Sequence, residues 1–476
     1  MTEQLSPLEA IMWRVGQDAT LRMTVGTLMI LDRSPTAEAL ADRVALVAHR
    51  APRLSRRPDD PTGIRARPAW IDEPDPAPAH HLRTLSVAAP GSMRQLLDLV
   101  GLLEAIPFDP DRSPWDLTLI EGLEDGRAAL YLRAHHVLTD GVGGMRLLGL
   151  LLDEPQWPGV GIPTPVPPKP AVAAPASNGD RRPGTLTVTI DLTKAVRRFI
   201  STAQFARSVD PIDTAVRGVQ RALDAANSVS RQLMVTGGPL AERPASSSML
   251  SRFEVLSVED ARSAALALGG SRNDLVVAAA AAGLGTYYER LGQPCLELRL
   301  ATPAGQRRNH EAGGNWFAPT RLEVPTTVGR RPGPQFGVVV ERLAQSRREP
   351  ALRLASSLAT TIGRLPTRML LPALHAQADS VDFTATALPG LRGARHICGA
   401  QIESSYPLGP RLGCPMNITA FGNGDRLDVG IALDEGAFAQ PEALVDCLRD
   451  AFGALAAASD AVGDADRGAP AGREPG

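Results

Sequence analysis

The stretch Ala128–Gly144, which reads AALYLRAHHVLTDGVGG, carries the strongest indication of fold in this 476-residue sequence. Its first half places Leu130 and Leu132 on one face, which predicts a strand that runs into a loop. Its second half is rich in glycine, and the helix expected from Met145 to Leu152 would anchor that loop from behind. Because helical and strand patterns alternate throughout residues 1–150, we expect an α/β fold.

The loop contains a run of the form HHxxxDG, from His135-His136 to Asp140-Gly141. Histidine is the side chain suited to removing a proton near neutral pH. Asp140 can fix the loop through charge-assisted hydrogen bonds. Gly141 lets the backbone turn tightly and lets a substrate approach closely. The run therefore indicates a catalytic site that works by proton transfer.

Two plainer interpretations of the HHxxxDG run stay open, a metal site and a purely structural role. Adjacent histidines on a strand point to opposite faces, and the sequence has no HExxH or CxxC partner, so we predict no metal site. A second pair, His80-His81, has Leu85 in place of the aspartate, and no glycine-rich loop follows it. This second pair predicts ordinary surface or strand histidines.

Composition and charge exclude several classes of protein. The 50 Lys and Arg residues against 52 Asp and Glu residues leave a net charge of −2, without the excess needed to neutralise nucleic-acid phosphates. Aromatic residues make up only 4%, too few for base-stacking platforms. The longest apolar stretch, around Leu275 to Gly285, is far shorter than the ~20 residues that span a bilayer. We therefore expect no nucleic-acid partner and, at most, peripheral contact with a membrane.

Cysteine usage and the N-terminus indicate the compartment. The four cysteines lie far apart without a CxxC pair, which predicts reduced thiols rather than a disulfide framework. The opening MTEQLSPLEA lacks the basic and apolar regions of a signal peptide. Both features predict a cytoplasmic protein.

The sequence divides into two α/β halves, because helix and strand patterns occur on both sides of a proline-dense segment. That segment has neither period, and such a density of proline favours an extended linker. The last residues are rich in Asp, Gly, Ala and Pro, a composition typical of disorder. We expect an N-terminal domain over residues 1–154, a crossover linker over 155–183, a C-terminal domain over 184–458 and a disordered tail over 459–476.

The segment HHVLTDGVGGMRLL, residues 135–148, resembles the active-site signature of the bacterial wax ester synthase/diacylglycerol acyltransferase family. That family belongs to the HxxxD superfamily of CoA-dependent acyltransferases. Other segments are similar to family motifs in the same order along nearly the whole chain. They are Leu5–Ala10, Ser113–Asp116, Asn273-Asp274, Arg307 with Gly314-Asn315, Tyr406–Pro410, Asn417–Thr419 and Asp428–Asp434.

The resemblance implies a fold and a reaction. The fold is α/β, with two chloramphenicol-acetyltransferase-like domains of mixed sheets flanked by helices and an active site in a channel at their interface. His136 is then the general base, His135 packs beneath the site and Asp140 orders the loop. Acyl-CoA is the co-substrate, no cofactor is bound, and the acceptor is diacylglycerol or a long-chain alcohol. Attack on the thioester is direct, in keeping with a sequence that has no G-x-S-x-G elbow.

Six residues are candidates for substrate or acyl-CoA binding, and three of them also have an ordinary structural explanation. Trp115 could line an acyl channel or fill the core. Asn273 could donate to the oxyanion or cap the helix that follows it. Arg307 could meet CoA phosphates or stay solvated. The six candidates are Trp115, Asn273, Asp274, Arg307, Asn315 and Asn417.

Three positions depart from the family pattern. Gln17 stands in place of an acidic residue, Thr24 in place of a histidine and Ala387 in place of an asparagine. These changes leave open the same chemistry on another hydroxylated lipid or polyketide, or a catalytically weak paralogue that binds lipid. In each case the resemblance places the protein in the cytoplasm, peripherally on the inner membrane or on lipid droplets.

Overall fold

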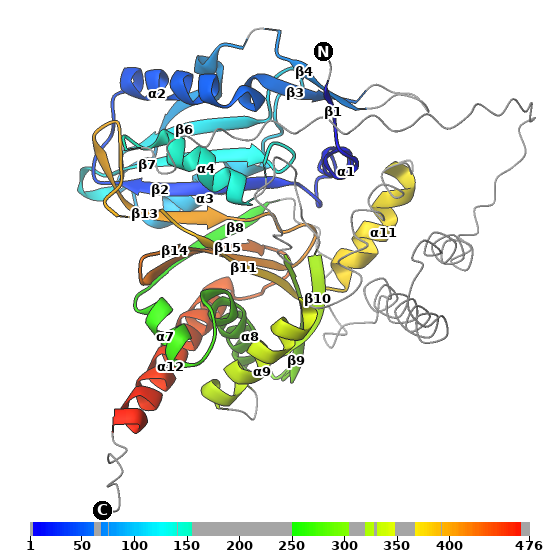
Figure 1. Ribbon diagram of the computed structural model, residues 1–476, viewed down its shortest axis with the longest axis vertical. Helices are drawn as coiled ribbons and strands as arrows, with labels where there is room; N and C mark the ends of the chain where they lie inside the picture. Colours follow the sequence, from blue (N-terminus) through cyan, green and yellow to red (C-terminus); the bar gives the residue numbers. More distant parts are fainter. Residues whose placement is uncertain are drawn as a thin grey trace, which may run out of the picture.

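The computed structural model describes residues 3–60, 68–74, 76–139, 141–154, 250–303, 319–327, 331–347, 367–391 and 393–467. The linker expected over 155–183 lies outside these residues, as do Asp140, Arg307 and Asn315. The described chain forms two stacked halves, each built on one large sheet (Figure 1).

The sheet of the N-terminal half has six strands in the order β12-β13-β2-β7-β6-β5. Its helices are α1 (Pro7–Val15), α2 (Ala37–Arg50), α3 (Met93–Ala105) and α4 (Gly141–Leu151). A small sheet of β1 (Glu3–Gln4), β4 (Ala69–Asp72) and β3 (Arg56–Asp59) lies beside it. The strands of the large sheet are β2 (Thr24–Leu31), β5 (Leu82–Ser86), β6 (Trp115–Glu121), β7 (Ala128–His135), β12 (His396–Ile397) and β13 (Ala400–Leu408).

The period of β7 places its side chains in two different cores. Leu130 packs with the core under α2 and α4, while Tyr131 packs with the core under α3. Both residues are fully buried, so the sheet is covered on both faces. The predicted strand over Ala128–His136 is confirmed as β7, which ends one residue earlier.

The C-terminal half carries the second six-stranded sheet, in the order β10-β9-β11-β14-β15-β8. Its helices are α7 (Ala261–Ala267), α8 (Arg272–Arg290), α9 (Pro332–Ser346), α11 (Thr367–Asp379) and α12 (Pro441–Arg467). Its strands are β8 (Ser251–Val258), β9 (Glu297–Pro303), β10 (Pro319–Pro325), β11 (Phe383–Pro389), β14 (Met416–Asn423) and β15 (Arg426–Asp434).

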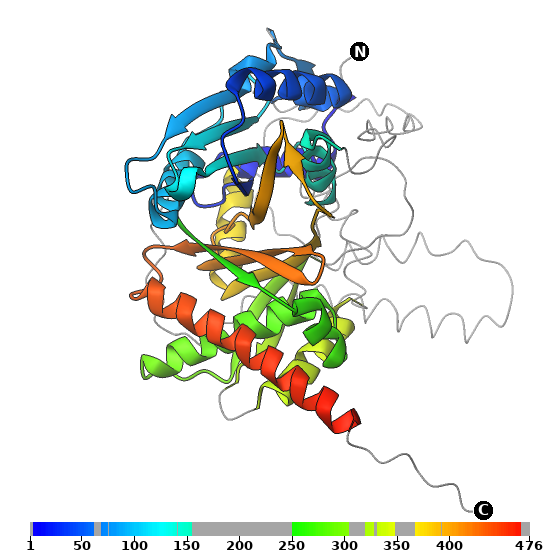
Figure 2. The same cartoon turned by 90° about the vertical axis from the view of Figure 1, so that its left-hand side faces the viewer.

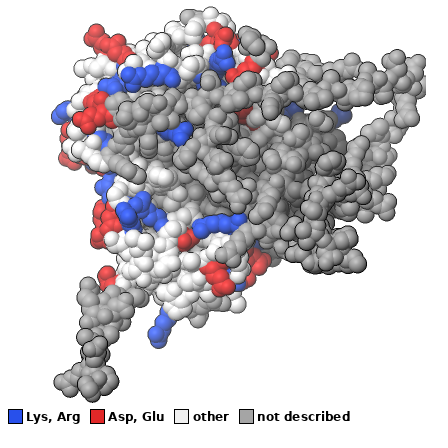
Figure 3. Space-filling model, in the orientation of Figure 1, with Lys and Arg blue, Asp and Glu red and all other residues white. Residues whose placement is uncertain are grey.

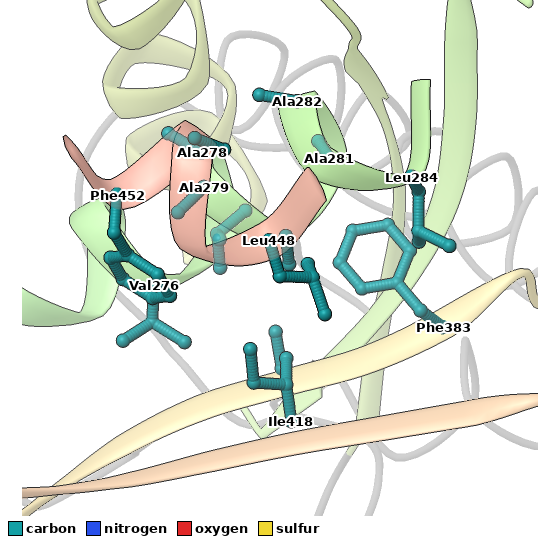
Figure 4. Packing of buried hydrophobic residues seen from close by; sticks show 14 of the residues in the cluster. Val276, Ala278, Ala279, Ala281, Ala282, Leu284, Phe383, Ile418, Leu448 and Phe452 are labelled. Carbon is teal, nitrogen blue, oxygen red and sulfur yellow. The ribbon is translucent and has the colours of Figure 1, made fainter. Parts of the chain in front are cut away.

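Helices α7, α8, α9 and α12 cover one face of its sheet, with α12 running across the outside, whereas α11 packs against α1 of the N-terminal half (Figure 2). Val276 and Leu284 of α8, with Leu448 of α12, point toward Ile418 and Phe383 of the sheet (Figure 4). Small residues between them, such as the alanine run of α8, let α12 approach closely. This core leaves the opposite face of the sheet turned toward the N-terminal half.

Two strands of the C-terminal half, β12 and β13, join the sheet of the N-terminal half. Although β13 lies between β11 and β14 of the C-terminal half in sequence, it pairs antiparallel with β2, Leu408 lying opposite Gly26. The expectation that residues 184–458 form a separate domain is therefore corrected, because β12 and β13 complete the N-terminal sheet. Burial explains the exchange, since Ile402 of β13 fills the N-terminal core.

Three helix limits differ from the sequence prediction. Helix α4 begins at Gly141 rather than Met145, so the glycines at its start are helical. Ser271, not Asn273, caps α8, and its capping box with Asp274 satisfies the first amides. Helix α12 continues to Arg467, nine residues into the segment 459–476 that the sequence predicts to be a disordered tail.

All four cysteines are free thiols, three of them buried and Cys398 half-buried. Within the described part of the chain, no helix combines the length and apolar character needed to cross a bilayer.

Candidate active site

Backbone hydrogen bonds fix the end of β7, where the histidine pair lies. The amide of His135 donates to the carbonyl of Pro114 at 2.8 Å, and the amide of His136 donates to that of Met23 at 2.7 Å. Thr24 lies opposite His135 in the strand pair. The two histidines are therefore attached to β6 on one side and to the start of β2 on the other.

His135 is a neutral, buried histidine. Its Nδ1 accepts a hydrogen bond from the amide of Val137 at 3.1 Å, so the ring proton lies on Nε2. The ring meets Trp13 edge-on at 5.2 Å, and only 4% of the residue is exposed. Burial, and to a smaller extent the neighbouring His136, lowers the pKa of His135 to about 3. This placement agrees with a role beneath the site rather than in proton exchange.

His136 is half-buried at the start of the loop that leads into α4. The backbone of α4 starts at Gly141, directly after the loop. Asp140 lies outside the described residues, so its expected loop-ordering contact stays a prediction. A half-buried histidine here can reach both the interior and the solvent.

An apolar cavity of about 110 Å³ lies beside the loop. Thr139 and Gly144 line it from the loop and α4, and Val47, Leu54 and Trp115 line it from the body of the N-terminal half. Its mainly apolar lining suits part of an apolar chain whose polar end stays at the histidine loop.

The C-terminal half supplies the remaining wall of this cavity. Leu388 of β11, Leu408 of β13 and Phe421 of β14 line it together with Thr419. The cavity therefore lies at the interface of the two halves, where the family resemblance places the active site.

Asn417 belongs to a polar row on that wall. Its Nδ2 donates to Thr384 at 2.7 Å, and its Oδ1 accepts from the Thr419 hydroxyl at 2.8 Å. A Cβ on Gly409 would come within 2.4 Å of Asn417 Oδ1, so glycine allows the row to pack under β13. Thr384 and Thr419 were not among the sequence candidates, although Thr419 closes the Asn417–Thr419 motif.

Asn273 and Asp274 make different contacts at the start of α8. The Asn273 Oδ1 accepts from the amide of Ala387 at 3.1 Å, which ties α8 to β11. Asp274 is buried, accepts from Ser271 in the capping box and pairs with Arg347 at 3.1 Å. The prediction that Asn273 caps α8 is therefore wrong. The capping box and the ion pair with Arg347 are a complete structural explanation of the buried Asp274.

The structure also shows the surroundings of the three residues that depart from the family pattern. Gln17 donates to the carbonyl of Trp13 at 3.2 Å, and Thr24 is buried opposite His135. Ala387 contributes only its backbone amide to the site, through Asn273. No disrupted contact among the described residues marks these substitutions.

Buried charges support the strand that carries the histidines. Arg133 of β7 pairs with Asp116 of β6 at 2.7 Å, and it also donates to the carbonyl of Ile106 at 2.7 Å. Burial raises the pKa of Glu104, against the effect of nearby arginines, of which Arg22 is the largest. Sequence inspection missed this cluster, since Arg133 reads as an ordinary strand residue.

Comparison with known proteins shows which family the chain is similar to. The family model described as wax ester synthase/diacylglycerol acyltransferase catalytic domain matches residues 5–276, and the corresponding C-terminal domain matches residues 313–456. A putative diacylglycerol O-acyltransferase of Mycobacterium tuberculosis is 30% identical, covering 95% of this chain and 91% of the relative. A probable diacylglycerol O-acyltransferase of the same organism, tgs2, is 27% identical over 80% of this chain and 82% of its own length.

Solved structures agree on the fold. The wax ester synthase/diacylglycerol acyltransferase of Marinobacter aquaeolei VT8 superposes with a TM-score of 0.60 at 18% identity, over 96% of this chain and all of the other. The first condensation domain of the CDA synthetase superposes with a TM-score of 0.58 at 15% identity, over 96% of both chains. Fold and site thus define a two-domain, chloramphenicol-acetyltransferase-like acyltransferase. The chain belongs to the wax ester synthase/diacylglycerol acyltransferase family.

Proposed function

We propose that this enzyme transfers a long-chain acyl group from acyl-CoA to the free hydroxyl of diacylglycerol, giving triacylglycerol. Long-chain alcohols are the second acceptor class, giving wax esters. The observation that carries the proposal is the position of the apolar cavity, which adjoins the histidine loop at the interface of the two halves. An acyl chain in this cavity would place its thioester near His136.

In the proposed reaction, His136 takes the proton of the acceptor hydroxyl. The hydroxyl oxygen forms a bond to the thioester carbon, the carbon–sulfur bond breaks, and the departing CoA sulfur takes up the proton. His135 is a poor substitute for His136 as the base, because its low pKa makes it a weak base and its unprotonated nitrogen, Nδ1, already accepts from the Val137 amide. General-base help of this kind contributes about 10²–10⁴-fold to the rate.

Hydrogen-bond donors must stabilise the oxyanion that forms during attack. Because the Oδ1 of Asn273 is engaged by Ala387, its Nδ2 group is left as the donor. The Asn417 amide is already committed to Thr384, so we assign Asn417 to support of the cavity wall. Asn273 is the oxyanion donor in this proposal.

The test measures CoA release and ester formation by purified protein with palmitoyl-CoA and paired acceptors, dioleoylglycerol and hexadecanol. We expect His136→Ala to lower the rate by about 10²–10⁴-fold. His80→Ala is the matched control, since His80 is exposed and lies outside the cavity. Equal rates in His136→Ala and wild type would refute the base assignment, and the absence of any CoA release in wild type would favour a lipid-binding paralogue.

We further propose that the enzyme meets its substrates at a membrane or lipid-droplet surface by apolar contact. On the face drawn in Figure 3, the described Lys and Arg side chains lie interspersed with Asp and Glu. Such a face gives little attraction to anionic lipid. Binding to diacylglycerol-containing vesicles should then change little between low and high salt, and a strong salt dependence would contradict this mode.

A further inference from the structure

We propose that His81 and Glu73 are positioning residues that hold Trp115 in place as a wall of the apolar cavity and so set its preference for acyl-chain length. The inference rests on the proposed function, because it takes the cavity to hold the acyl chain. His81 belongs to the pair that the sequence predicts to be ordinary surface or strand histidines. That prediction holds for the exposed His80 and is wrong for His81, which is buried in a 3₁₀ turn.

The imidazole of His81 lies flat against the indole of Trp115. The ring centroids are 4.3 Å apart, and the planes differ by only 9°. The His81 Nδ1 lies 2.8 Å from the backbone carbonyl of Trp115, and because a carbonyl only accepts, Nδ1 carries a hydrogen. One histidine therefore holds both the ring and the backbone of Trp115.

Glu73 holds His81 from the other side. Its Oε1 lies 3.3 Å from His81 Nε2 and also accepts a hydrogen bond from the amide of Ser113, two residues before Trp115. Glu73, His81 and Ser113 are 6%, 4% and 2% exposed, so this polar group is enclosed. Burying a carboxylate and an imidazole is costly unless they are paired, and a core tryptophan does not need such support.

The cavity explains why Trp115 needs the support of His81 and Glu73. Trp115 lines the cavity, so on that side it has fewer of the dispersion contacts that hold a fully enclosed core residue. The other restraint is its Nε1–H, which donates to the carbonyl of Leu54, itself a cavity residue, at 2.9 Å. Without His81, the ring could tilt into the cavity and shorten the space for a chain.

Trp115 is also attached to the catalytic strand. It pairs with Ala134, the residue before His135, in the β6–β7 ladder. A shift of the Trp115 backbone would therefore reach the histidine loop, whereas a tilt of the indole alone would change only the cavity. The two effects separate in the kinetics, because the first alters kcat with every donor and the second alters the ranking of donors.

The activity test compares kcat/KM for octanoyl-CoA and palmitoyl-CoA with one acceptor. We expect His81→Leu to lower the palmitoyl/octanoyl ratio by about tenfold, the scale at which apolar pockets discriminate chain length. His80→Leu is the matched control and should keep the wild-type ratio. A folded His81→Leu protein with the wild-type ratio would overturn the proposal.

A second measurement keeps the test valid if His81→Leu leaves Glu73 without a partner and unfolds. The double variant His81→Leu/Glu73→Gln removes that charge and is measured in the same way, with the same ratio expected. The emission of Trp115, obtained as the difference from the Trp115→Phe protein, reports the ring stack without any turnover. We expect this emission to change in intensity or wavelength when His81 is replaced, since the indole loses the ring stacked on it, and unchanged emission would overturn the stack.

The two readouts distinguish failure of this inference from failure of the proposed function. If wild type shows no acyl transfer while Trp115 emission responds to His81 and to added palmitoyl-CoA, the proposed reaction fails and the positioning role stands. If acyl transfer occurs and neither the donor ratio nor the emission responds, the positioning role fails and the reaction stands.

Discussion

Gly16 lies against the ring of His135 and offers the sharpest test of how the histidine pair is held. It follows α1 with an ordinary backbone φ of −63°, so an alanine there has no conformational strain. A Cβ at this position would come within 2.4 Å of His135 Nε2 and 2.9 Å of the Met12 carbonyl. The ring contact is about 1 Å shorter than ordinary van der Waals contact, so the His135 ring must move.

The ring has little freedom to move. Its Nδ1 is held by the Val137 amide, and its edge is packed against Trp13. Overpacking of this kind costs about 1–3 kcal/mol of unfolding free energy. A shift of about 1 Å transmitted to His136 would lower kcat by about 10²-fold, the usual scale for misplacement of a catalytic group.

The measurement combines urea unfolding with acyl transfer by Gly16→Ala protein. The matched control is Gly453→Ala in α12, where a Cβ meets nothing within 4 Å. Alanine in an exposed helix position should raise stability there by about 0.5–1 kcal/mol and leave kcat unchanged. If Gly16→Ala is as stable and as active as wild type, the close packing around His135 does not position the base, and the reasoning is wrong.

Three further predictions concern the same site. Because folding lowers the pKa of His135 from an ordinary 6.5 to about 3, the unfolded chain binds the extra proton between these values, and the stability due to neutral His135 falls as pH drops through this window. His135→Gln should therefore lose less unfolding free energy than wild type between about pH 7 and about pH 4.5, and an equal loss in urea titrations would contradict the assignment. Arg133→Met should cost about 3–5 kcal/mol by leaving the buried Asp116 with only the half-exposed Arg83, 3.8 Å away, and Arg133→Met/Asp116→Leu should recover part of this in the same titrations, because the hydrogen bonds to the Leu103 and Ile106 carbonyls stay lost; no recovery would mean that the pair is not the cause. Asn273→Ala should lose about 1 kcal/mol with the Ala387 hydrogen bond, whereas Asn273→Asp keeps the acceptor oxygen and should keep the stability, so equal loss in both would contradict the bond.

Local patterns of the sequence predicted most of the secondary structure that carries the site. Apolar periods predict helices over Ala37–Leu54 and Met93–Ile106 and a strand over Arg426–Asp434, and the structure has α2, α3 and β15 there, as it has β7 where the strand before the histidine pair is predicted. The pairing of β13 with β2 could not be predicted in this way, because it joins residues nearly 400 positions apart and depends on which core Ile402 fills. Register and exchange between sheets are long-range properties that a local period does not contain.

In the candidate site, too, some features follow from a local pattern and others depend on contacts between residues far apart in the sequence. The HHxxxDG run predicts the loop as the candidate site directly, since proton transfer needs a histidine and a tight turn. The pair His80-His81 lacks the aspartate and the glycine-rich loop. The burial of His81 against Trp115 depends on a contact across 34 positions, which a local pattern does not contain. Asn273 shows the opposite error, because a cap was read from its position before a helix, while Ser271 two residues earlier supplies the cap.

The strand exchange also bears on where catalysis resides. The match to the family's catalytic domain ends at residue 276, before β11, β13 and β14. Yet these strands supply Leu388, Leu408 and Phe421 to the cavity beside the histidine loop. β13 also pairs with β2 next to the His135 strand, Leu408 lying opposite Gly26. A fragment that stops at residue 276 would carry His136 without one wall of the neighbouring cavity and with an unpaired edge on β2, so the cavity beside the histidine loop is formed by both halves together.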